Sequence, residues 1–456
     1  MNATQTTSKL TASRIAVIFG LLLCMTGVGN TADREQRYSL SQAVRAALEN
    51  NHELKAQRNA AAAKQEEIGV ARSFLLPKIF LEERYLRTVN PGYAFMAKLD
   101  QQRIAAGDFI PDTLNHPDAV NDFQSTISIE QPLFMRKAAI GLEMSKGESR
   151  AAAEDLGRKK EETAFKAVQS YLMVGTAAAF IKVAEKAGED AQEHRRTAEL
   201  RYKNGLGLYS DLLRANTAVA DAQQQLVSAE KDLAVAKRAL GLILGLASAV
   251  DVTEMPPPLP LRDPDYYREQ ALARRDIKVL ALRTENAKKN VKLAAAAYFP
   301  TLGVGGAYQL NDHSAPLGAE GDNWQLTAFL KWEAFDGRKM VHERRKAEYE
   351  AAATEEYLEG LKKMIFFRVQ EAYLTIEETA KNRKLAEEAV QAAEEGRRLV
   401  RVRYEGSLSP LVDLLDAQVS IDHARANLVA KENDYRLAIA RLSYESGTIL
   451  SDLQVE

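Results

Sequence analysis

Residues 201–215 read RYKNGLGLYSDLLRA, and residues 403–417 read RYEGSLSPLVDLLDA. Arg-Tyr, a leucine and Asp-Leu-Leu-x-Ala recur at matching positions, with Arg403 opposite Arg201 and Asp413 opposite Asp211. The spacing between the two copies is far longer than the roughly 20–50-residue period of a solenoid. The repeat therefore predicts a chain built from two related halves, with the two segments in equivalent places of the fold.

The composition excludes several classes of function. The chain has 456 residues, 27% of them charged, and a formal net charge of −2, so no overall basic surface indicates a nucleic-acid partner. The histidines are scattered without the spacing of metal ligands, and there is no phosphate-binding glycine loop or nucleophile motif. We therefore expect no enzyme, no catalytic residue, no metal site and no cofactor.

The first 32 residues have the order of a secretory signal peptide: basic residues, an apolar run at 15–23, then small residues. The run is shorter than the roughly 20 residues of a membrane-spanning helix, which disfavours an anchor. Cys24, the single cysteine, follows Leu23, a poor match to the small residue that normally precedes a lipidated cysteine. No later apolar run approaches spanning length, so any membrane insertion must use β-strands.

Two long stretches are rich in strong helix formers and poor in proline. They cover about residues 136–245 and 337–447, and each predicts a long helix pair around one copy of the repeat. A helix of about 65 residues would be on the order of 100 Å long. A compact globule does not accommodate such a helix, so the sequence predicts a coiled-coil or tubular assembly.

Two shorter regions, at about 78–134 and 301–335, read as strand hairpins. Trp324, Leu326 and Leu330 lie on one face of a two-residue alternation whose other face is polar except for Phe329. This pattern is typical of a transmembrane barrel strand, although a soluble sheet with one wet face gives it too. Four strands cannot close a membrane barrel, which needs about eight, so several chains must pool their strands; three chains would supply twelve.

The predicted organisation follows from these pieces. The first repeat covers residues 33–255 and the second covers 266–456, each with a helix, a hairpin and a long helix pair. Residues 256–265 begin with three prolines and predict an extended linker. The polar, turn-rich stretch at 90–122 lengthens the first hairpin and is expected to be an elaborated loop.

In order and spacing these features resemble the TolC-like outer-membrane efflux proteins, the outer membrane factor family. The resemblance covers essentially the whole mature chain. It implies a mixed α and β membrane protein, a homotrimer with a 12-stranded transmembrane β-barrel and four strands per chain. A long periplasmic α-helical barrel continues that β-barrel. It also implies an exit duct in the cell outer membrane, extending into the periplasm, that passes small toxic compounds from a periplasmic adaptor (membrane fusion protein) and an inner-membrane pump.

The resemblance assigns the repeated segments to the periplasmic tip of the duct, where the tube closes. It places a periplasmic gate at four residues: Ser210, Asp211, Tyr404 and Ser409. Tyr404 matches the gate tyrosine and Asp211 its hydrogen-bond partner. The best-known members carry a gate arginine at the position of Ser409, so its bridge is absent here unless Arg403 or Arg214 replaces it.

Further roles at the tip follow from the same resemblance. Asp413 and Asp416 match the acidic residues of the constriction, where six carboxylates from three chains would attract cations. The residues expected to contact the adaptor are Gly205, Leu206, Ser407 and Leu408, although the second glycine has shifted by one position. Simpler roles stay open: Asp211 could stabilise a helix N-terminus, and Tyr404 could be a packing residue.

Two other functions remain possible from the sequence. The exit duct of a type I protein-secretion system would have the same channel, because the inner-membrane partner chooses the cargo. A non-channel periplasmic coiled-coil scaffold would explain the long helices but not the alternation at 324–335 or the long polar loop.

Overall fold

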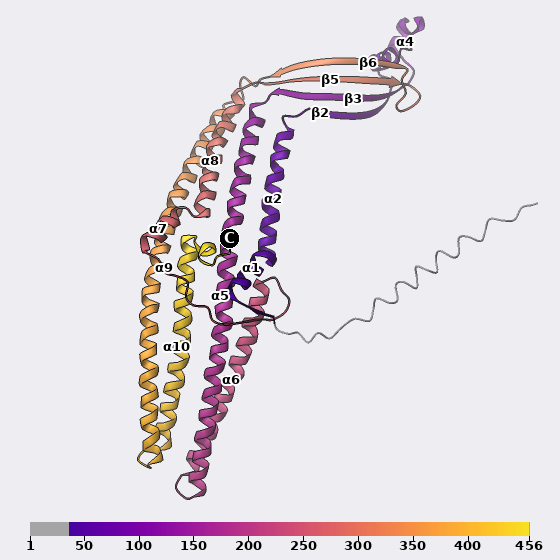
Figure 1. Cartoon of the computed structure of the whole chain (residues 1–456). Helices are drawn as coiled ribbons and strands as arrows, with labels where there is room; N and C mark the ends of the chain where they lie inside the picture. The colour runs from indigo at the N-terminus through magenta and orange to yellow at the C-terminus, as the bar shows by residue number, and fades with distance from the viewer. Residues whose placement is uncertain (1–35, 456) are drawn as a thin grey trace, which may run out of the picture.

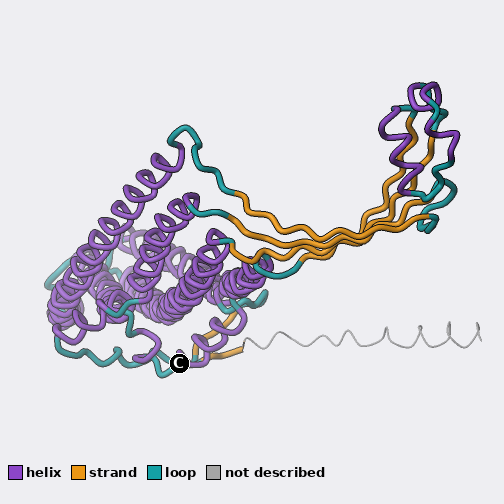
Figure 2. The backbone as a smooth tube through the Cα atoms, turned by 90° about the horizontal axis from the view of Figure 1, so that it is seen from above, coloured by secondary structure: helices purple, strands orange, loops and turns teal. Residues whose placement is uncertain are grey.

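The computed structural model describes residues 36–455. The predicted signal peptide at residues 1–32, with Cys24, lies outside the described residues. The described chain is elongated, with a β-sheet at one end and the turns of two helical hairpins at the other (Figure 1). Seen along the helices, the strands leave the helical part together and extend well beyond it (Figure 2).

Four helices form the long part of the molecule: α5 (Arg136–Lys203), α6 (Tyr209–Ile243), α9 (Lys339–Glu405) and α10 (Leu411–Ser446). The two longest have 68 and 67 residues, so each is about 100 Å long, which confirms the prediction of very long helices. Helix α5 packs against α6 and α10, and α10 packs against α9. The two hairpins therefore lie side by side in one layer (Figure 1).

Shorter helices continue this layer in its upper part and pack beside it (Figure 1). They are α1 (Leu40–Asn50), α2 (His52–Ser73), α7 (Pro264–Leu272), α8 (Arg275–Ala295), the 3₁₀ turn η2 (Ala296–Tyr298) and α11 (Ile449–Asp452). The sequence predicted one helix before each hairpin, but the structure has two. Asn51 separates α1 from α2. Its Oδ1 accepts from Leu54 N at 3.1 Å and so caps α2, and its Nδ2 donates to Ile243 O at 2.9 Å.

The sheet has four antiparallel strands in the order β2-β3-β5-β6. They are β2 (Lys78–Thr88), β3 (Val120–Phe134), β5 (Thr301–Asp312) and β6 (Gly321–Lys331). The two predicted hairpins are confirmed and lie next to each other. Strands β2 and β6 are the edges, and in the described chain neither has a partner on its outer side.

The register gives this sheet one apolar face. Ile79 pairs with Ile129, Ile129 with Gly306 and Gly306 with Leu326, so these positions share a face. The large exposed side chains on it are Ile79, Leu81, Tyr85, Ile127, Ile129, Tyr308, Trp324, Leu326 and Leu330. The opposite face is mostly polar. Its large apolar exceptions are Phe80, Leu86 and Phe329. Phe329 lies over Gly303, where an added Cβ would be 2.4 Å from the ring.

The stretch between β2 and β3 is more ordered than the predicted loop. It contains α3 (Pro91–Asp100), the 3₁₀ turn η1 (Ala106–Phe109) and α4 (Pro111–Asn115) at the far end of the strands (Figure 1). Proline begins both α-helices, because it lacks the N–H that a first helical turn leaves unpaired. Asn90 caps α3 through Oδ1, which accepts from Tyr93 N at 3.3 Å.

The main core lies where the short helices meet α5 and α6. Helix α5 contributes Ala164, Val168 and Tyr171, and the Tyr171 hydroxyl donates to Glu254 O at 2.9 Å and Tyr38 O at 3.2 Å. These acceptors flank a small parallel ladder, β1 (Gln36–Tyr38) with β4 (Val250–Val252), which the sequence did not predict. Strands of three residues are too short to show a two-residue period.

One prediction from the sequence, that no segment after the signal peptide is apolar and long enough to cross a membrane, does not hold for α5. Helix α5 contains an 18-residue window long and apolar enough to cross a membrane, although the sequence analysis found no later run of that kind. Of this window, 39% is buried, and α5 packs against α1, α2, α6, α8 and α10. The same composition is typical of a core helix, so this window is only weak evidence for a membrane span.

Gly241, near the end of α6, provides a test of the core. An added Cβ would lie 2.2 Å from the backbone oxygen of Ser248, which cannot rotate away. We expect Gly241→Ala to lower the free energy of unfolding by about 1–3 kcal/mol. At Gly360 no atom lies within 4 Å of an added Cβ. Gly360→Ala should therefore raise the free energy of unfolding by about 0.5–1 kcal/mol. Helical circular dichroism during denaturation in detergent measures both, and equal effects would contradict the close packing.

Candidate functional site

The two repeated segments form the turns at the end of the molecule farthest from the sheet. In the first, Gly205 N donates to Tyr202 O at 3.0 Å and Leu206 N to Arg201 O at 2.8 Å. In the second, Ser407 N donates to Tyr404 O and Leu408 N to Arg403 O at the same distances. The two helices therefore end in the same hydrogen-bonded motif.

The turns differ at the residue that adopts the left-handed conformation. Gly205 has φ 71° and Ser407 has φ 60°. The neighbouring Gly406 is not left-handed, with φ −76°. A serine at this position costs roughly 1 kcal/mol relative to glycine. The second turn is therefore under local strain that the first turn avoids.

Arg201 joins the two turns. Its Nη1 donates to Tyr404 O at 3.2 Å, its Nη2 donates to Ser407 Oγ at 2.7 Å, and its guanidinium lies 4.9 Å from the centre of the Tyr404 ring. The serine that strains the turn thus supplies an acceptor for the other hairpin. The sequence analysis considered Arg403 and Arg214 for a bridging role, but among the described residues neither forms an ion pair.

Tyr404 lies in the packing between the hairpins. It is 5% exposed and clusters with Ala198, Ala215, Leu411 and Leu414. Burial raises the pKa of the Tyr404 phenol, and the nearby Asp211 charge adds to this effect. Within the described residues its hydroxyl makes no hydrogen bond to Asp211. Its surroundings are therefore those of a packing residue within one chain.

The other predicted tip residues lie close to these turns. Asp211 is in the first turn of α6 and Asp413 is in the first turn of α10. Asp413 and Asp416 are both exposed, three residues apart, and no described basic side chain pairs with either carboxylate. Ser210 is exposed, whereas the Ser409 hydroxyl is buried without a hydrogen-bond partner in the protomer.

The four residues expected to contact an adaptor lie on the outside of the two turns. Gly205 and Ser407 are exposed, and Leu206 and Leu408 are 71% and 74% exposed. Matching apolar side chains therefore project from the two turns into solvent. Tyr202 instead packs on Tyr209 across the first turn, with ring centroids 5.3 Å apart.

A buried polar cluster above the tip was not predicted. Arg397 of α9 donates to Asp190 Oδ2 of α5 at 2.8 Å and to Gln418 Oε1 of α10 at 3.2 Å. Gln418 Nε2 donates to Asp190 Oδ2 at 3.2 Å and to Asp422 Oδ1 at 3.0 Å. Three of the four long helices meet in this network. The sequence gives no local signal for it, because its members come from three separate segments.

The charges in this cluster are unequal. Burial opposes ionisation of Asp190, but Lys186 and Arg397 keep its pKa below the ordinary value. Burial and the nearby Asp190 charge raise the pKa of Asp422 despite its bonds from Gln418. Burial also lowers the pKa of His194, which lies 3.4 Å from Gln418 Oε1. Asp422 is therefore the member whose ionised form the surroundings disfavour.

Comparison with known proteins identifies the class of this fold. The model of the outer membrane efflux protein family matches residues 43–246 and 267–448, which together include most of the chain. The chain belongs to this family. It is accordingly an outer-membrane protein of a family of efflux channels. No curated protein sequence gives a significant match.

Solved structures share the fold at low sequence identity. A membrane protein from Pseudomonas aeruginosa is 18% identical with a TM-score of 0.77, over 90% of this chain and 91% of that one. The Campylobacter jejuni CmeC outer membrane channel is 17% identical with a TM-score of 0.74, over 90% and 86%. Vibrio cholerae VceC is 16% identical with a TM-score of 0.74, over 91% and 97%.

The raised pKa of Asp422 predicts a pH-dependent stability. Above its ordinary pKa of 3.8, the unfolded chain loses this proton before the folded chain does, so stability falls as pH rises through the folded pKa. We expect Asp422→Asn to raise the free energy of unfolding near neutral pH by up to about 1 kcal/mol. The gain should shrink as the pH falls toward the ordinary carboxyl pKa of 3.8, because the wild-type carboxyl takes up its proton over this range.

Thermal denaturation followed by circular dichroism across this pH range measures the effect. Asp221→Asn removes an exposed carboxylate of α6 and is the control. A gain that is independent of pH, or equal in the control, would contradict the assignment.

Proposed function

We propose that this chain is the exit duct of a tripartite efflux system, passing small toxic compounds from a periplasmic adaptor and an inner-membrane pump to the exterior. The proposal rests on one observation: a single chain combines a sheet that is apolar on one face with helices about 100 Å long. The sheet suits the outer membrane, and the helices suit a passage through the periplasm. The similar structures of Campylobacter jejuni CmeC and Neisseria gonorrhoeae MtrE are those of outer membrane channels.

A homotrimer follows from the edges of the sheet. Strands β2 and β6 present backbone N–H and C=O groups that the described chain does not pair, and lipid offers no hydrogen bonds to them. Pairing β6 of one protomer with β2 of the next would satisfy these groups. Three chains would close a twelve-stranded barrel, with the apolar face toward lipid and the polar face toward the lumen.

The two halves of the chain correspond part by part in this proposal. Residues 33–255 and 266–456 each supply short helices, one hairpin and one long helix pair, joined by the linker at 256–265. The halves differ most in the helical insert between β2 and β3. Three chains with two such halves would give the tube a pseudo-sixfold arrangement.

The tip is the proposed gate. Arg201 and Tyr404 hold the two turns of one protomer together, and Asp211 and Ser409 have polar atoms left for a neighbouring protomer. Asp413 and Asp416 would form the acidic ring. Leu206 and Leu408 offer exposed apolar contacts to the adaptor.

The alternatives fit less of the structure. A coiled-coil scaffold without a pore would leave the apolar sheet face with no role. The duct of a type I protein-secretion system would have this same channel, and co-purification with an adaptor and its pump distinguishes it from an efflux duct.

Reconstitution into planar bilayers tests the channel and its gate. We expect small, infrequent openings for the wild type and more frequent openings for Arg201→Ala. Loss of links worth about 1 kcal/mol at this partly exposed site would shift the closed-to-open ratio about fivefold. Tyr404→Phe and Asp211→Ala should also loosen the tip, because each removes a polar group that has no partner among the described residues of one chain and would bind a neighbouring protomer.

The matched control is Lys203→Ala, which removes an exposed cation of the same helix end that pairs with Glu199 of its own helix. A wild-type chain that fractionates as soluble and gives no channels would refute the duct. Equal openings in the arginine and lysine variants would instead refute only the role of Arg201.

The acidic ring predicts cation selectivity. Asp413→Asn combined with Asp416→Asn should move the reversal potential in a salt gradient toward zero and weaken block by divalent cations, since six carboxylates are lost per trimer. Asp265→Asn, on the exposed surface of α7, is the control. An unchanged reversal potential in the double variant would show that these carboxylates do not face the lumen.

A further inference from the structure

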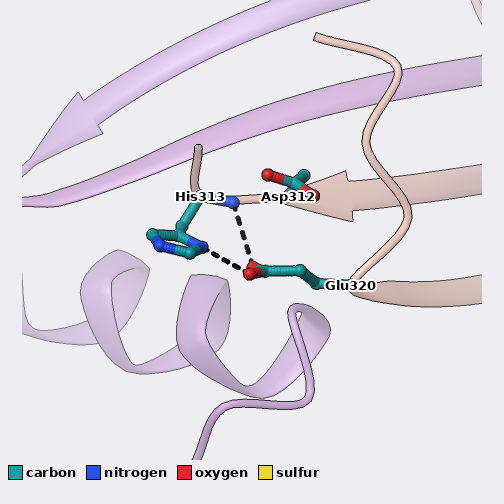
Figure 3. A group of neighbouring side chains, drawn as sticks. All are labelled: Asp312, His313 and Glu320. Carbon is teal, nitrogen blue, oxygen red and sulfur yellow. Dashed lines mark hydrogen bonds and ion pairs between the residues drawn. The ribbon is translucent and has the colours of Figure 1, made fainter. Parts of the chain in front are cut away.

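The connection between β5 and β6 holds a cluster of ligand-type side chains that the duct does not use. Asp312 ends β5, His313 follows it, and Glu320 directly precedes β6. One ligand atom from each lies within 4.8 Å of the others (Figure 3). The sequence analysis expected no metal site, because the histidines lack ligand spacing; here the hairpin brings a distant carboxylate to an Asp-His pair.

The imidazole is directed at the glutamate. His313 Nδ1 lies 2.6 Å from Glu320 Oε1, and the backbone N–H of His313 donates to Glu320 Oε2 at 3.2 Å (Figure 3). Nδ1 is shielded from solvent and has no hydrogen bond of acceptable angle. This nitrogen is therefore held close to a carboxylate oxygen without a well-formed bond to it.

The aspartate has one oxygen in use and one free. Asp312 is 7% exposed, and its Oδ1 accepts from Ser314 N at 2.6 Å, Ser314 Oγ at 2.7 Å and Ala315 N at 3.0 Å. Within the described part of the chain no group donates to Oδ2. Oδ2 itself reaches the surface of the loop, so it is accessible as a ligand atom for an ion.

Gly318 keeps the space at this oxygen open. An added Cβ at Gly318 would lie 2.1 Å from Asp312 Oδ2. Any other residue at this position would push against the free oxygen. The loop therefore brings its backbone close to the carboxylate and leaves no side chain there.

From these contacts we propose that Asp312, His313 and Glu320 bind one divalent transition cation of the zinc type. One imidazole nitrogen, two carboxylate oxygens and a water complete the four-coordinate set that Zn²⁺ accepts. Mg²⁺ and Ca²⁺ prefer six or more oxygen ligands, which this loop does not offer. At metal–ligand distances of about 2.0–2.2 Å, adjacent donors of a tetrahedron are about 3.3 Å apart, so the His313–Glu320 contact opens slightly when the ion replaces it.

The ion would tie the start of the loop to its end. Asn311 pairs with Gly321 at the last position of the β5–β6 ladder, and the nine residues between them include all three ligands. This hairpin end lies at the tip of the sheet remote from the long helices (Figure 1). The site would therefore be a metal clasp on a surface loop, independent of the gate at the other end of the molecule.

Metal binding to the full-length protein in detergent tests the proposal. The protein is purified without a histidine tag, freed of metal with chelator and titrated calorimetrically with ZnCl₂ in excess Mg²⁺. We expect one zinc ion per chain, and at least a tenfold weaker affinity in His313→Ala and Glu320→Gln. Asp312→Asn keeps the Oδ1 acceptor of the turn, so it tests the ligand role with less disturbance of the loop.

The matched control is His116→Ala in the neighbouring insert. His116 Nδ1 lies 3.3 Å from Asp112 Oδ1, an exposed histidine–carboxylate pair without a second carboxylate. It should leave the zinc affinity unchanged. No zinc binding by the wild type, or an equal loss in His116→Ala, would overturn the site. The binding measurement does not depend on bilayer conductance, so failure of the duct proposal and failure of the zinc site would be seen separately.

Discussion

The unpaired edges of the four-stranded sheet are the constraint on which the rest of the architecture depends. The described chain pairs β2 with β3, β3 with β5 and β5 with β6, and leaves the outer sides of β2 and β6 open. In the proposed duct these groups lie in a membrane without water to bind them, so strands from other copies would have to pair with them. The number of copies that closes the sheet would then set the number of long helices below it. Only Met135 separates β3 from α5, so the two parts cannot assemble independently.

The same coupling explains why the two hairpin turns are alike in backbone but not in side chains. Each must end a very long helix and reverse the chain within a few residues, and the same hydrogen-bonded motif does so in both. The first turn uses glycine at the left-handed position, which costs little. The second uses Ser407, whose hydroxyl accepts from Arg201. The strained position therefore adds a contact between the hairpins that a glycine could not provide.

The features that could be predicted from the sequence are those carried by local periodicity. The alternation around Trp324 predicted an amphipathic strand, and the proline-poor stretch after Arg136 predicted a very long helix; both are confirmed. The prolines at 91 and 111 were signals for helix starts in the insert, but the polar composition around them favoured a loop. The break at Asn51 was missed because the cap depends partly on Ile243, far along the chain.

Contacts between segments could not be predicted from one sequence. Nothing in the repeat distinguishes Arg201, which reaches the other hairpin, from Arg403, which does not. His313 has no ligand spacing within the chain, since Glu320 reaches it only after the strands turn. The proposed roles of Asp211, Tyr404, Asp413 and Asp416 depend on neighbouring protomers, so the geometry of one chain leaves them as proposals.

The buried polar cluster at Arg397 has a physical role in this long-helix architecture. The contacts between α5, α9 and α10 include many alanines, and such small side chains allow neighbouring registers of similar energy. A buried charge left without its partner costs several kcal/mol. Arg397 donates to Asp190 and to Gln418 in the observed register, and a shift by one helical turn would separate it from both groups. Asp190 would then keep only Lys186, a residue of its own helix, among its described cationic partners. The cluster thus selects the register that brings the two turns level at the tip, which the bonds of Arg201 to Tyr404 and Ser407 require.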